Sequence, residues 1–459
     1  MQSKAFSNGM ISLLALVLLA SSACVGSATP TSGQSSAPPR TPTATGTFTA
    51  PLVSTSTTAP VPAAVSRQMD AIEGQVELLR GLSLKRPIDR ALLTTGALAQ
   101  RVQDDFLKDY TQDDAKKDSV VLSAFGLLPK GFDLRGFLLK LYAEQVAGFY
   151  DSKTKEMYVV QDKGFGGVER MTYAHETVHA LQDQTYDLEN GMKMNNDYCY
   201  QHTEYCGAVQ ALVEGDASLI EQLWFGRYAT EQDKQDVQSF YQSYSSPVYD
   251  SAPEYLKQDF LFPYNQGLNF VTSLVQKGGY GAVDAAFKNP PVSTEQILHP
   301  DRYPQDTPRQ VDLPDFSATL GTGWQEIDRN VLGEWYTDLV LSAGKDPTFR
   351  LDTTVAAQAA EGWGGDSYVV YQNSSTGGVA LVWESVWDTE ADRQQFLEAL
   401  QTYAADRWEP PSAKNAGNTS WDHTADGAIQ ISTTGQSVAL LIAPQPELLS
   451  RLGQTLAQP

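Results

Sequence analysis

The sequence predicts an α+β protein: a mainly helical domain with a small mixed sheet, then a smaller domain built on an antiparallel sheet. Three observations point to this class. Apolar residues recur every three or four positions over residues 168–181, the period of an amphipathic helix. Two apolar runs within residues 145–160 flank a turn at residues 151–155, as in a β-hairpin. Beyond residue 316, strand-like runs alternate with helical patterns.

Residues 1–24 have the pattern of a secretion signal. Lys4 is followed by an apolar run from Met10 to Ala20 and then by small residues before Cys24. The run is too short to span a bilayer by itself. A cysteine in this place resembles a bacterial lipobox, which implies that Cys24 becomes the lipidated first residue of the mature chain. The alternative is cleavage by ordinary signal peptidase, and either route predicts export.

Residues 25–66 are predicted to form a disordered tether. They consist mainly of Ser, Thr, Pro, Ala and Gly, with Arg40 as their single charged residue. Such a composition cannot bury enough apolar surface to fold. Together with a lipid at Cys24, the tether predicts a protein anchored to the cell membrane and facing outside the cytoplasm, at the bacterial cell surface or in the periplasm.

The charge balance argues against nucleic acid as a partner. Lys4 and Arg40 are the only charged residues before residue 67, so the rest of the chain holds 31 Lys and Arg against 55 Asp and Glu, a balance of −24. A chain this acidic repels the phosphate backbone.

About 390 residues follow the tether, which is too many for one ordinary core. We expect one domain over residues 67–312 and a second over residues 313–459, with the Pro- and Asp-rich stretch 299–316 as the joint. In the second domain, helices are expected over residues 325–342, 352–361 and 389–404, and strands over residues 367–371, 379–387, 428–432 and 437–442. This pattern predicts a small antiparallel sheet with helices on one face.

An HExxH segment holds two of the five histidines of the chain, His175 and His179. Residues four apart on a helix share a face, so both imidazoles can bind one cation. Glu176 follows the first ligand directly, and from there its carboxylate can reach a metal-bound water without binding the metal. The segment therefore predicts a zinc site with Glu176 as general base.

A catalytic zinc needs a third protein ligand, and with histidine scarce a carboxylate is expected. Glu214 is the best candidate, within a helical pattern over residues 208–220. Gly215 follows it, although glycine costs about 1 kcal/mol in a helix interior. That glycine indicates a close approach of another backbone or of the metal site.

Cys199 and Cys206 are the only cysteines after Cys24. In an oxidising compartment they are expected to form a disulfide. The alternative is a second zinc site of Cys199, His202 and Cys206, which would lack a clear fourth ligand.

The sequence HETVHALQD, followed by a helix containing EGDA, resembles the gluzincin clan of zinc metallopeptidases, the thermolysin-like group. The resemblance implies a zincin-like fold, one Zn²⁺ per chain held by His175, His179 and Glu214, and Glu176 as catalytic base. It also implies a peptide or protein substrate. The hairpin within residues 145–160 is similar to the one that supplies an edge strand for substrate in such peptidases; an ordinary sheet edge is the alternative.

The chain departs from the thermolysin-like pattern at Ser218. The family has an aspartate there, four residues after the ligand glutamate, to orient the first histidine. Asp183 and Asp216 are the other residues that could orient an imidazole, and the sequence does not choose among the three. His299 is a candidate oxyanion donor, with a simple turn residue before a proline as the alternative.

The sequence thus predicts a membrane-anchored, extracytoplasmic zinc metallopeptidase. Two alternatives stay open. One is a peptide-binding lipoprotein that keeps the fold but catalyses nothing, and the other is a zinc amidohydrolase that acts on cell-wall peptide.

Overall fold

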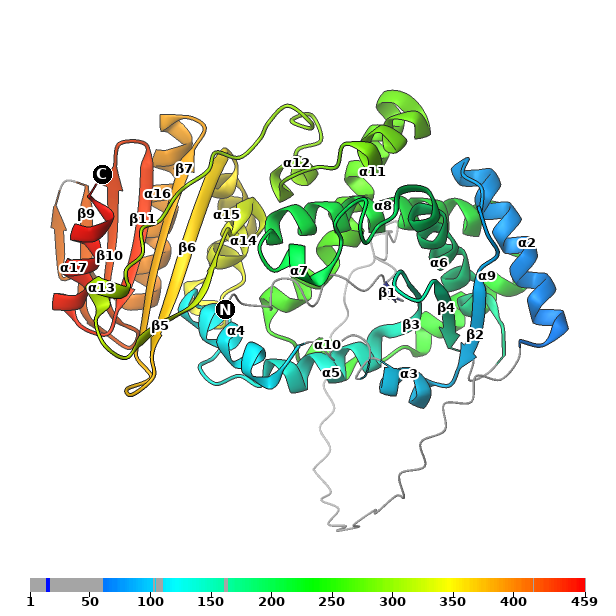
Figure 1. Ribbon diagram of the computed structural model, residues 1–459, viewed down its shortest axis with the longest axis horizontal. Helices are drawn as coiled ribbons and strands as arrows, with labels where there is room; N and C mark the ends of the chain where they lie inside the picture. The colour runs from blue at the N-terminus through cyan, green and yellow to red at the C-terminus, as the bar shows by residue number, and fades with distance from the viewer. Residues whose placement is uncertain are drawn as a thin grey trace, which may run out of the picture.

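The computed structural model describes residues 14–16, 61–101, 104, 110–160, 164–415 and 417–458 of the 459-residue chain. The α+β class predicted from the sequence is confirmed (Figure 1). Cys24 and most of the predicted signal peptide and tether lie outside the described residues. Among the helices that the structure describes, none is long and apolar enough to cross a membrane.

The N-terminal part is mainly helical. Its helices are α2 (Ala63–Arg80), α3 (Thr95–Arg101), α4 (Gln112–Ala124), α5 (Leu134–Gln145), α6 (Gly167–Tyr186), α7 (Asn196–Cys199), α8 (Thr203–Tyr228), α9 (Glu231–Ser243), α10 (Pro247–Asp250), α11 (Glu254–Lys288) and α12 (Thr294–Leu298). Helix α2 begins four residues before the predicted end of the tether, so residues 63–66 are helical rather than disordered.

A small mixed sheet accompanies these helices. Its strands are β1 (Leu14–Leu16), β2 (Asp89–Leu93), β3 (Val146–Asp151) and β4 (Glu156–Val160), in the order β1-β3-β4-β2. Strands β3 and β4 form the predicted hairpin, with Asp151 opposite Glu156 at its turn. Strand β2 runs parallel to β4, whereas β1 pairs antiparallel with β3.

The HExxH segment lies on a helix, as predicted. On α6 the apolar positions Met171, Ala174, Val178 and Leu181 are buried in a core that also receives apolar residues of α2 and α8. Every residue from 171 to 183 is buried, so this stretch of α6 is enclosed on all sides, and these apolar positions form one of its faces. The ligand positions are therefore mounted on a packed element.

Helices α8 and α11 cross in backbone contact. A Cβ atom on Gly215 would lie 2.1 Å from the carbonyl oxygen of Gly267, and one on Gly267 would lie 2.0 Å from the carbonyl oxygen of Ala211. No side chain fits at this crossing. The close approach that Gly215 predicts is therefore present, and it draws α11 toward the HExxH helix.

The C-terminal part is built on a seven-stranded antiparallel sheet of order β5-β6-β7-β11-β10-β9-β8 (Figure 1). Its strands are β5 (Trp324–Asn330), β6 (Trp363–Asn373), β7 (Val379–Trp387), β8 (Ala413–Asn415), β9 (Asn418–Thr424), β10 (Gly427–Thr434) and β11 (Ser437–Ala443). Its helical elements are α13 (Ser317–Leu320), α14 (Gly333–Ser342), η2 (Pro347–Phe349), α15 (Thr353–Ala360), α16 (Glu390–Trp408) and α17 (Pro446–Leu456).

Three details of this part differ from the prediction. The sheet has seven strands rather than the four expected. Residues 325–330 belong to strand β5 instead of starting a helix, because they pair with β6 along their length. Helices lie on both faces of the sheet rather than on one. Residues of α14, α15 and α16 pack into the core on one face, and residues of α13 and α17 pack into a separate core on the other.

The two parts share their largest core. Phe125 packs edge-on against Tyr368 of β6 and Trp383 of β7, and its carbonyl oxygen accepts a hydrogen bond from the hydroxyl of Tyr403 on α16. The predicted joint, residues 299–316, does lack helices and strands. The parts are nevertheless continuous, because the chain after α4 reaches across to the C-terminal sheet.

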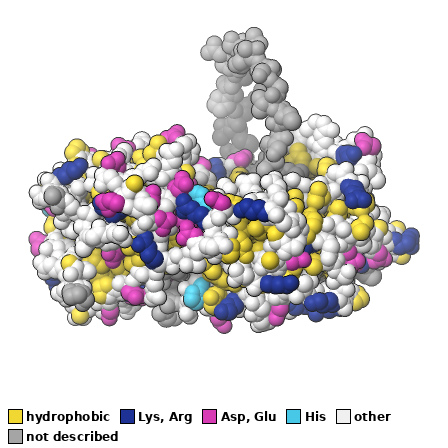
Figure 2. Space-filling view, turned by 90° about the horizontal axis from the view of Figure 1, so that it is seen from above, with side chains coloured by type: hydrophobic (Ala, Val, Ile, Leu, Met, Phe, Trp, Pro, Cys, Tyr) yellow, Lys and Arg dark blue, Asp and Glu magenta, His cyan; other side chains and the backbone are white. Residues whose placement is uncertain are grey.

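One face of the surface carries acidic and basic side chains mixed together. Figure 2 shows Asp and Glu side chains interspersed with Lys and Arg on the face turned to the viewer.

Candidate metal centre

Two helices bring a pair of histidines and a glutamate together. His175 and His179 lie on α6 and Glu214 lies on α8. The Nε2 atoms of His175 and His179 are 3.2 Å and 3.4 Å from Oε2 of Glu214. All three side chains are almost completely buried. The structure thus places in one spot the three side chains that the sequence predicts as ligands.

Three atoms of this site that could bind or face a metal ion lack a hydrogen-bond partner within the described part of the chain. They are Glu176 Oε1, His179 Nε2 and Glu214 Oε1. Buried polar atoms are nearly always satisfied, so such a group calls for an explanation. A bound cation would satisfy them, and two imidazoles with one carboxylate are a donor set typical of catalytic zinc. The side chains therefore fit a zinc ion.

Glu176 lies between the ligands and strand β3. Its Oε2 atom accepts a hydrogen bond of 2.6 Å from the backbone N–H of Tyr150, which leaves Oε1 directed elsewhere. Burial raises the pKa of Glu176 to about 7, against the opposing effect of the His179 and His175 imidazoles. A carboxylate with a pKa near neutrality can both take and return a proton, as a general base must.

Glu214 differs from Glu176 in its electrostatics. Burial alone would raise the pKa of Glu214, but the neighbouring His179 and His175 imidazoles lower it below its usual value. The pKa values of the two buried carboxyl groups are thus shifted in opposite directions. Glu214, whose pKa is lowered, is the one placed to bind a cation.

The outer partner of His175 is Glu221. The Nδ1 atom of His175 is 2.6 Å from Oε2 of Glu221, so Nδ1 donates and Nε2 keeps its lone pair for a metal. This residue was not predicted; Asp183, Asp216 and Ser218 were considered instead. Glu221 lies seven residues after Glu214, which is two helical turns, so it shares the ligand's face of α8.

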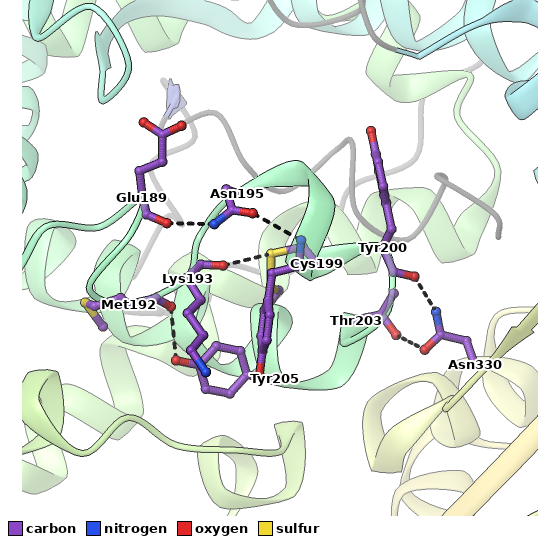
Figure 3. Close-up of a disulfide and its surroundings, with 11 residues drawn as sticks. Glu189, Met192, Lys193, Asn195, Cys199, Tyr200, Thr203, Tyr205 and Asn330 are labelled. Atoms are coloured by element: carbon purple, nitrogen blue, oxygen red, sulfur yellow. Dashed lines mark hydrogen bonds between the residues drawn. A yellow bond between two sulfur atoms is a disulfide. The ribbon is translucent and has the colours of Figure 1, made fainter. Parts of the chain in front are cut away.

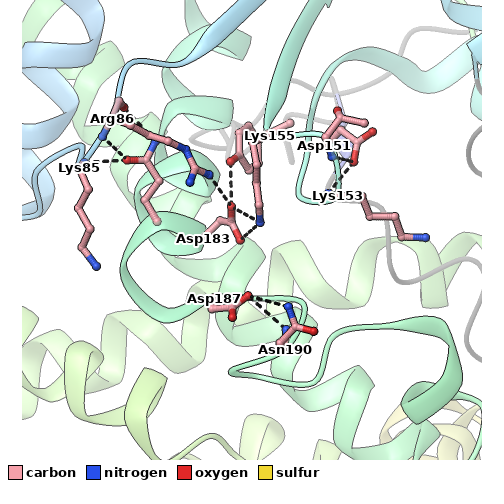
Figure 4. Close-up of polar contacts among 11 residues, drawn as sticks. Lys85, Arg86, Asp151, Lys153, Lys155, Asp183, Asp187 and Asn190 are labelled. Carbon is pink, nitrogen blue, oxygen red and sulfur yellow. Dashed lines mark hydrogen bonds and ion pairs between the residues drawn. The ribbon is translucent and has the colours of Figure 1, made fainter.

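Asp183 fastens the hairpin instead of orienting a histidine (Figure 4). Its carboxylate accepts a hydrogen bond from the hydroxyl of Tyr150, at 2.8 Å, and pairs with the ammonium group of Lys155, at 2.8 Å. Arg86 lies 3.9 Å away. Asp183 therefore holds the β3–β4 hairpin against α6. One of its partners is Tyr150, the residue whose backbone N–H contacts Glu176.

Asp216 contacts the other histidine, His179, indirectly through Gln182. Its Oδ2 atom accepts hydrogen bonds from Nε of Arg80, at 2.8 Å, and from Nε2 of Gln182, at 3.0 Å. Gln182 in turn lies 2.9 Å from Nδ1 of His179. The amide that contacts the imidazole thus comes from Gln182, three residues after His179, and Asp216 supports it.

Tyr264 of α11 is a further residue beside the site that the sequence did not reveal. Its ring centroid is 6.4 Å from that of His175. Burial raises its pKa well above the usual value, and the nearby carboxylates of Glu214, Glu176 and Glu221 raise it further. Its hydroxyl thus stays protonated and can donate a hydrogen bond. The sequence feature that could have pointed to Tyr264 is its position one turn before Gly267, because that glycine lies at the crossing with α8.

His299 lies apart from the histidine pair. It follows α12, and its Nε2 atom is 2.8 Å from Oε1 of Glu334 on α14. Helix α12 meets α8 at Glu204, whose carboxylate accepts a hydrogen bond from the N–H of Thr294. Glu204 precedes Glu214 by ten residues, about 15 Å along the helix axis. The structure therefore does not bring His299 to the site as an oxyanion donor, and its contacts are those of an ion pair.

Three carboxylates gather near His299. Oxygen atoms of Glu295, Asp306 and Asp388 lie within 4.8 Å of one another. Arg302 pairs with Glu295 and lies 3.8 Å from Asp388. An arginine already neutralises much of this charge, so the group is an ion-pair cluster that ties the C-terminal sheet to the segment after α12.

Cys199 and Cys206 form the predicted disulfide (Figure 3). It joins α7 to the first turn of α8. The ring of His202 stacks on Tyr198 with centroids 4.1 Å apart. The alternative of a second zinc site at these cysteines is therefore wrong, and the bridge stabilises the connection between the two helices that hold the candidate ligands.

Comparison with known proteins bears on the C-terminal part alone. Residues 319–453 match a family described as a domain of unknown function, DUF8575. No curated protein and no solved structure matches the chain. The matched range covers the seven-stranded sheet and leaves the histidine pair outside. The C-terminal part is thus similar to the DUF8575 domain, and any function of the histidine site must be argued from its geometry.

Proposed function

We propose that this protein is a zinc-dependent metallopeptidase. The observation that carries the proposal is the convergence of His175, His179 and Glu214 in a buried site with Glu176 between the histidines. Three ligands, an adjacent carboxylate with a pKa near 7 and a nearby protonated tyrosine are the parts that hydrolysis of an amide requires.

Each side chain has a role in this proposal. A zinc ion held by the three ligands would lower the pKa of water and polarise the scissile carbonyl. Glu176 takes a proton from the attacking water as its oxygen bonds to the carbonyl carbon. Glu176 then returns the proton to the amine nitrogen as the C–N bond breaks. The Tyr264 hydroxyl donates a hydrogen bond to the oxyanion that forms.

The substrate is proposed to be an extended peptide. Strand β3 carries an edge on which β1 lies in antiparallel pairing, with Leu14 opposite Phe149. The next residue, Tyr150, donates its N–H to Glu176. Backbone pairing at such an edge binds a peptide of any sequence and would lay it past the base. Cleavage of the signal before Cys24 would remove β1 and leave the edge for substrate.

The location of the enzyme is part of the proposal. The signal-like segment, the small residues before Cys24 and the tether composition support export and lipid anchoring. The disulfide is consistent with an oxidising compartment. The substrate would then be a peptide or protein outside the cytoplasm.

The test is the variant Glu176→Gln. The amide keeps the shape of the side chain but cannot take a proton. We expect zinc content to stay at the wild-type level and hydrolysis of casein to fall at least about a hundredfold. Glu231→Gln, an exposed position, is the matched control and should leave activity unchanged.

Other outcomes favour other functions. Binding of peptides without turnover in the wild-type chain would favour a peptide-binding lipoprotein. Release of amino groups from purified peptidoglycan, with casein left intact, would favour a cell-wall amidohydrolase.

A further inference from the structure

We infer that Arg80, the last residue of α2, positions the zinc ligand His179 through Asp216 and Gln182. Helix α2 then contributes a positioning residue to the metal centre. The inference rests on the proposed zinc site and adds to it a positioning residue from a different segment of the chain.

Three contacts connect Arg80 to the imidazole. Nε of Arg80 donates to Oδ2 of Asp216 at 2.8 Å, and the same oxygen accepts from Nε2 of Gln182 at 3.0 Å. Oε1 of Gln182 lies 2.9 Å from Nδ1 of His179. All four side chains have no exposed surface. Water therefore cannot replace any member of the chain.

The direction of these hydrogen bonds follows from the chemistry of the amide. The Gln182 nitrogen faces two acceptors, the Asp216 carboxylate and the carbonyl oxygen of Val213, at 3.0 Å each. Only an NH₂ group can donate to both, so the Gln182 oxygen must face His179. Nδ1 of His179 must then donate, which leaves the lone pair on Nε2. Among the described residues that buried atom has no hydrogen-bond partner, and it lies 3.4 Å from Oε2 of the second candidate ligand Glu214, which suits a metal ligand.

Arg80 holds the Asp216 carboxylate in place. Nη1 of Arg80 is 2.8 Å from Oδ1 of Asp284, and its guanidinium lies 5.2 Å from the ring centroid of Tyr280. Without this cation, the buried Asp216 would lose its ionic partner, and the partly exposed Asp284 would keep only the hydrogen bond from Tyr186 among the described contacts. The Asp216 carboxylate could then shift, and Gln182 would lose the acceptor that fixes its amide.

The packing of helix α2 keeps Arg80 within reach of Asp216. Its buried residues Met69, Ile72 and Val76 pack in the same core as Val178 and Leu181 of α6. The helix stops directly after Arg80 at Gly81, whose φ of 76° is the left-handed conformation of a helix cap. Helix α2, the first helix in the described part of the chain, thus contributes to the metal site.

The test measures zinc affinity by competition with a chelating dye on the full mature chain. We expect Arg80→Met and Gln182→Leu each to weaken zinc binding by about 10- to 100-fold, the usual effect of losing an outer partner of a ligand. The double variant should be hardly weaker than either single one. Arg80→Lys should fall between Arg80→Met and wild type. Arg67→Met, at an exposed position of the same helix, should bind as wild type does.

A second readout separates positioning from loss of fold. In cobalt-substituted protein, Arg80→Met should change the visible absorption of the metal and Arg67→Met should not. Zinc affinity within about twofold of wild type in Arg80→Met, or losses that simply multiply in the double variant, would overturn the inference. If Arg80→Met does not fold, unchanged affinity in both Arg80→Lys and Gln182→Leu would overturn it equally.

The outcomes distinguish this inference from the proposed function. A wild-type chain that binds no zinc would overturn both. A chain that binds zinc but hydrolyses no peptide would remove the proposed peptidase activity, while the affinities of the variants would still decide the role of Arg80.

Discussion

The two imidazoles of the HExxH segment have different outer partners. His175 donates to a carboxylate, Glu221, whereas His179 donates to a neutral amide, that of Gln182. A carboxylate acceptor makes an imidazole a more basic ligand than an amide acceptor does. The site thus combines one strongly basic imidazole with one whose position depends on a network that reaches α2.

The candidate ligands could be proposed from the sequence because most of their information is local. His175, Glu176 and His179 lie within about one turn of one helix, and Glu214 was expected as the carboxylate of a second helical pattern. Glu221 was missed because the family pattern has its carboxylate four residues after the ligand, and here it comes seven residues after. Tyr264 was missed because α11 reaches the site only by folding.

At the residue scale, Tyr264→Phe tests the role of the tyrosine hydroxyl. The ring remains, so zinc content and KM should stay as in wild type. The loss of an oxyanion donor should lower kcat by about a hundredfold. Tyr249→Phe is the control, since the one hydrogen bond of that hydroxyl within the described residues goes to the carbonyl oxygen of Lys257, at 3.4 Å. Equal kcat values for Tyr264→Phe and wild type would remove Tyr264 from the mechanism.

At the scale of elements, the crossing of α8 and α11 decides where the site forms. Gly215 and Gly267 let the two backbones touch, and this contact brings Tyr264 beside His175. In the N-terminal part, the helices around His175 and Glu214 were predicted from their sequence patterns, whereas the other helices were not. Strand β5 was not predicted either, because residues 325–330 take their conformation from pairing with the distant strand β6, where Asn330 lies opposite Tyr368.

The variant Gly215→Ala tests this crossing. Its methyl group would meet the carbonyl oxygen of Gly267, and the helices would have to separate. We expect a loss of roughly 3 kcal/mol in the free energy of unfolding, measured by urea denaturation. Gly226→Ala on the same helix is the matched control. Nothing lies within 4 Å of its Cβ atom, so it should be neutral or slightly stabilising. Equal stabilities of the two variants would contradict the close crossing.

At the scale of the whole molecule, the N-terminal and C-terminal parts are joined by buried polar contacts as well as by a common core. The carboxyl group of Glu204 on α8 accepts hydrogen bonds from the N–H and the hydroxyl of Thr294 on α12, at 2.6 Å and 2.7 Å. The Thr294 hydroxyl oxygen in turn accepts a hydrogen bond of 3.2 Å from the backbone N–H of Trp335 on α14. The sequence predicted the position of the joint. It could not predict this continuity, which depends on contacts between residues far apart in the chain.

The buried Glu204 carboxyl predicts a pH dependence of stability. Burial raises its pKa to about 8, despite the opposing hydrogen bonds from Thr294. Its pKa in the unfolded chain is near 4.3, so between these values the folded state binds the proton and the unfolded state does not. Its contribution is therefore complete below about pH 4 and is lost as pH rises toward 8.

The variant Glu204→Gln measures this contribution. From pH 5 to pH 8, the wild-type free energy of unfolding should fall by roughly 4 kcal/mol more than that of the variant, since one pKa unit is worth about 1.4 kcal/mol. Parallel curves for Glu204→Gln and wild type would show that Glu204 is ionised in the folded protein.

The central claim is that His175, His179 and Glu214 hold one zinc ion. Metal content by mass spectrometry, on the mature chain and on Glu214→Ala purified in parallel, tests it most directly. We predict about one zinc per wild-type chain and a large loss in the variant. Wild-type protein free of zinc after purification in zinc-containing buffer, or zinc retained in full by Glu214→Ala, would contradict the proposed metal centre.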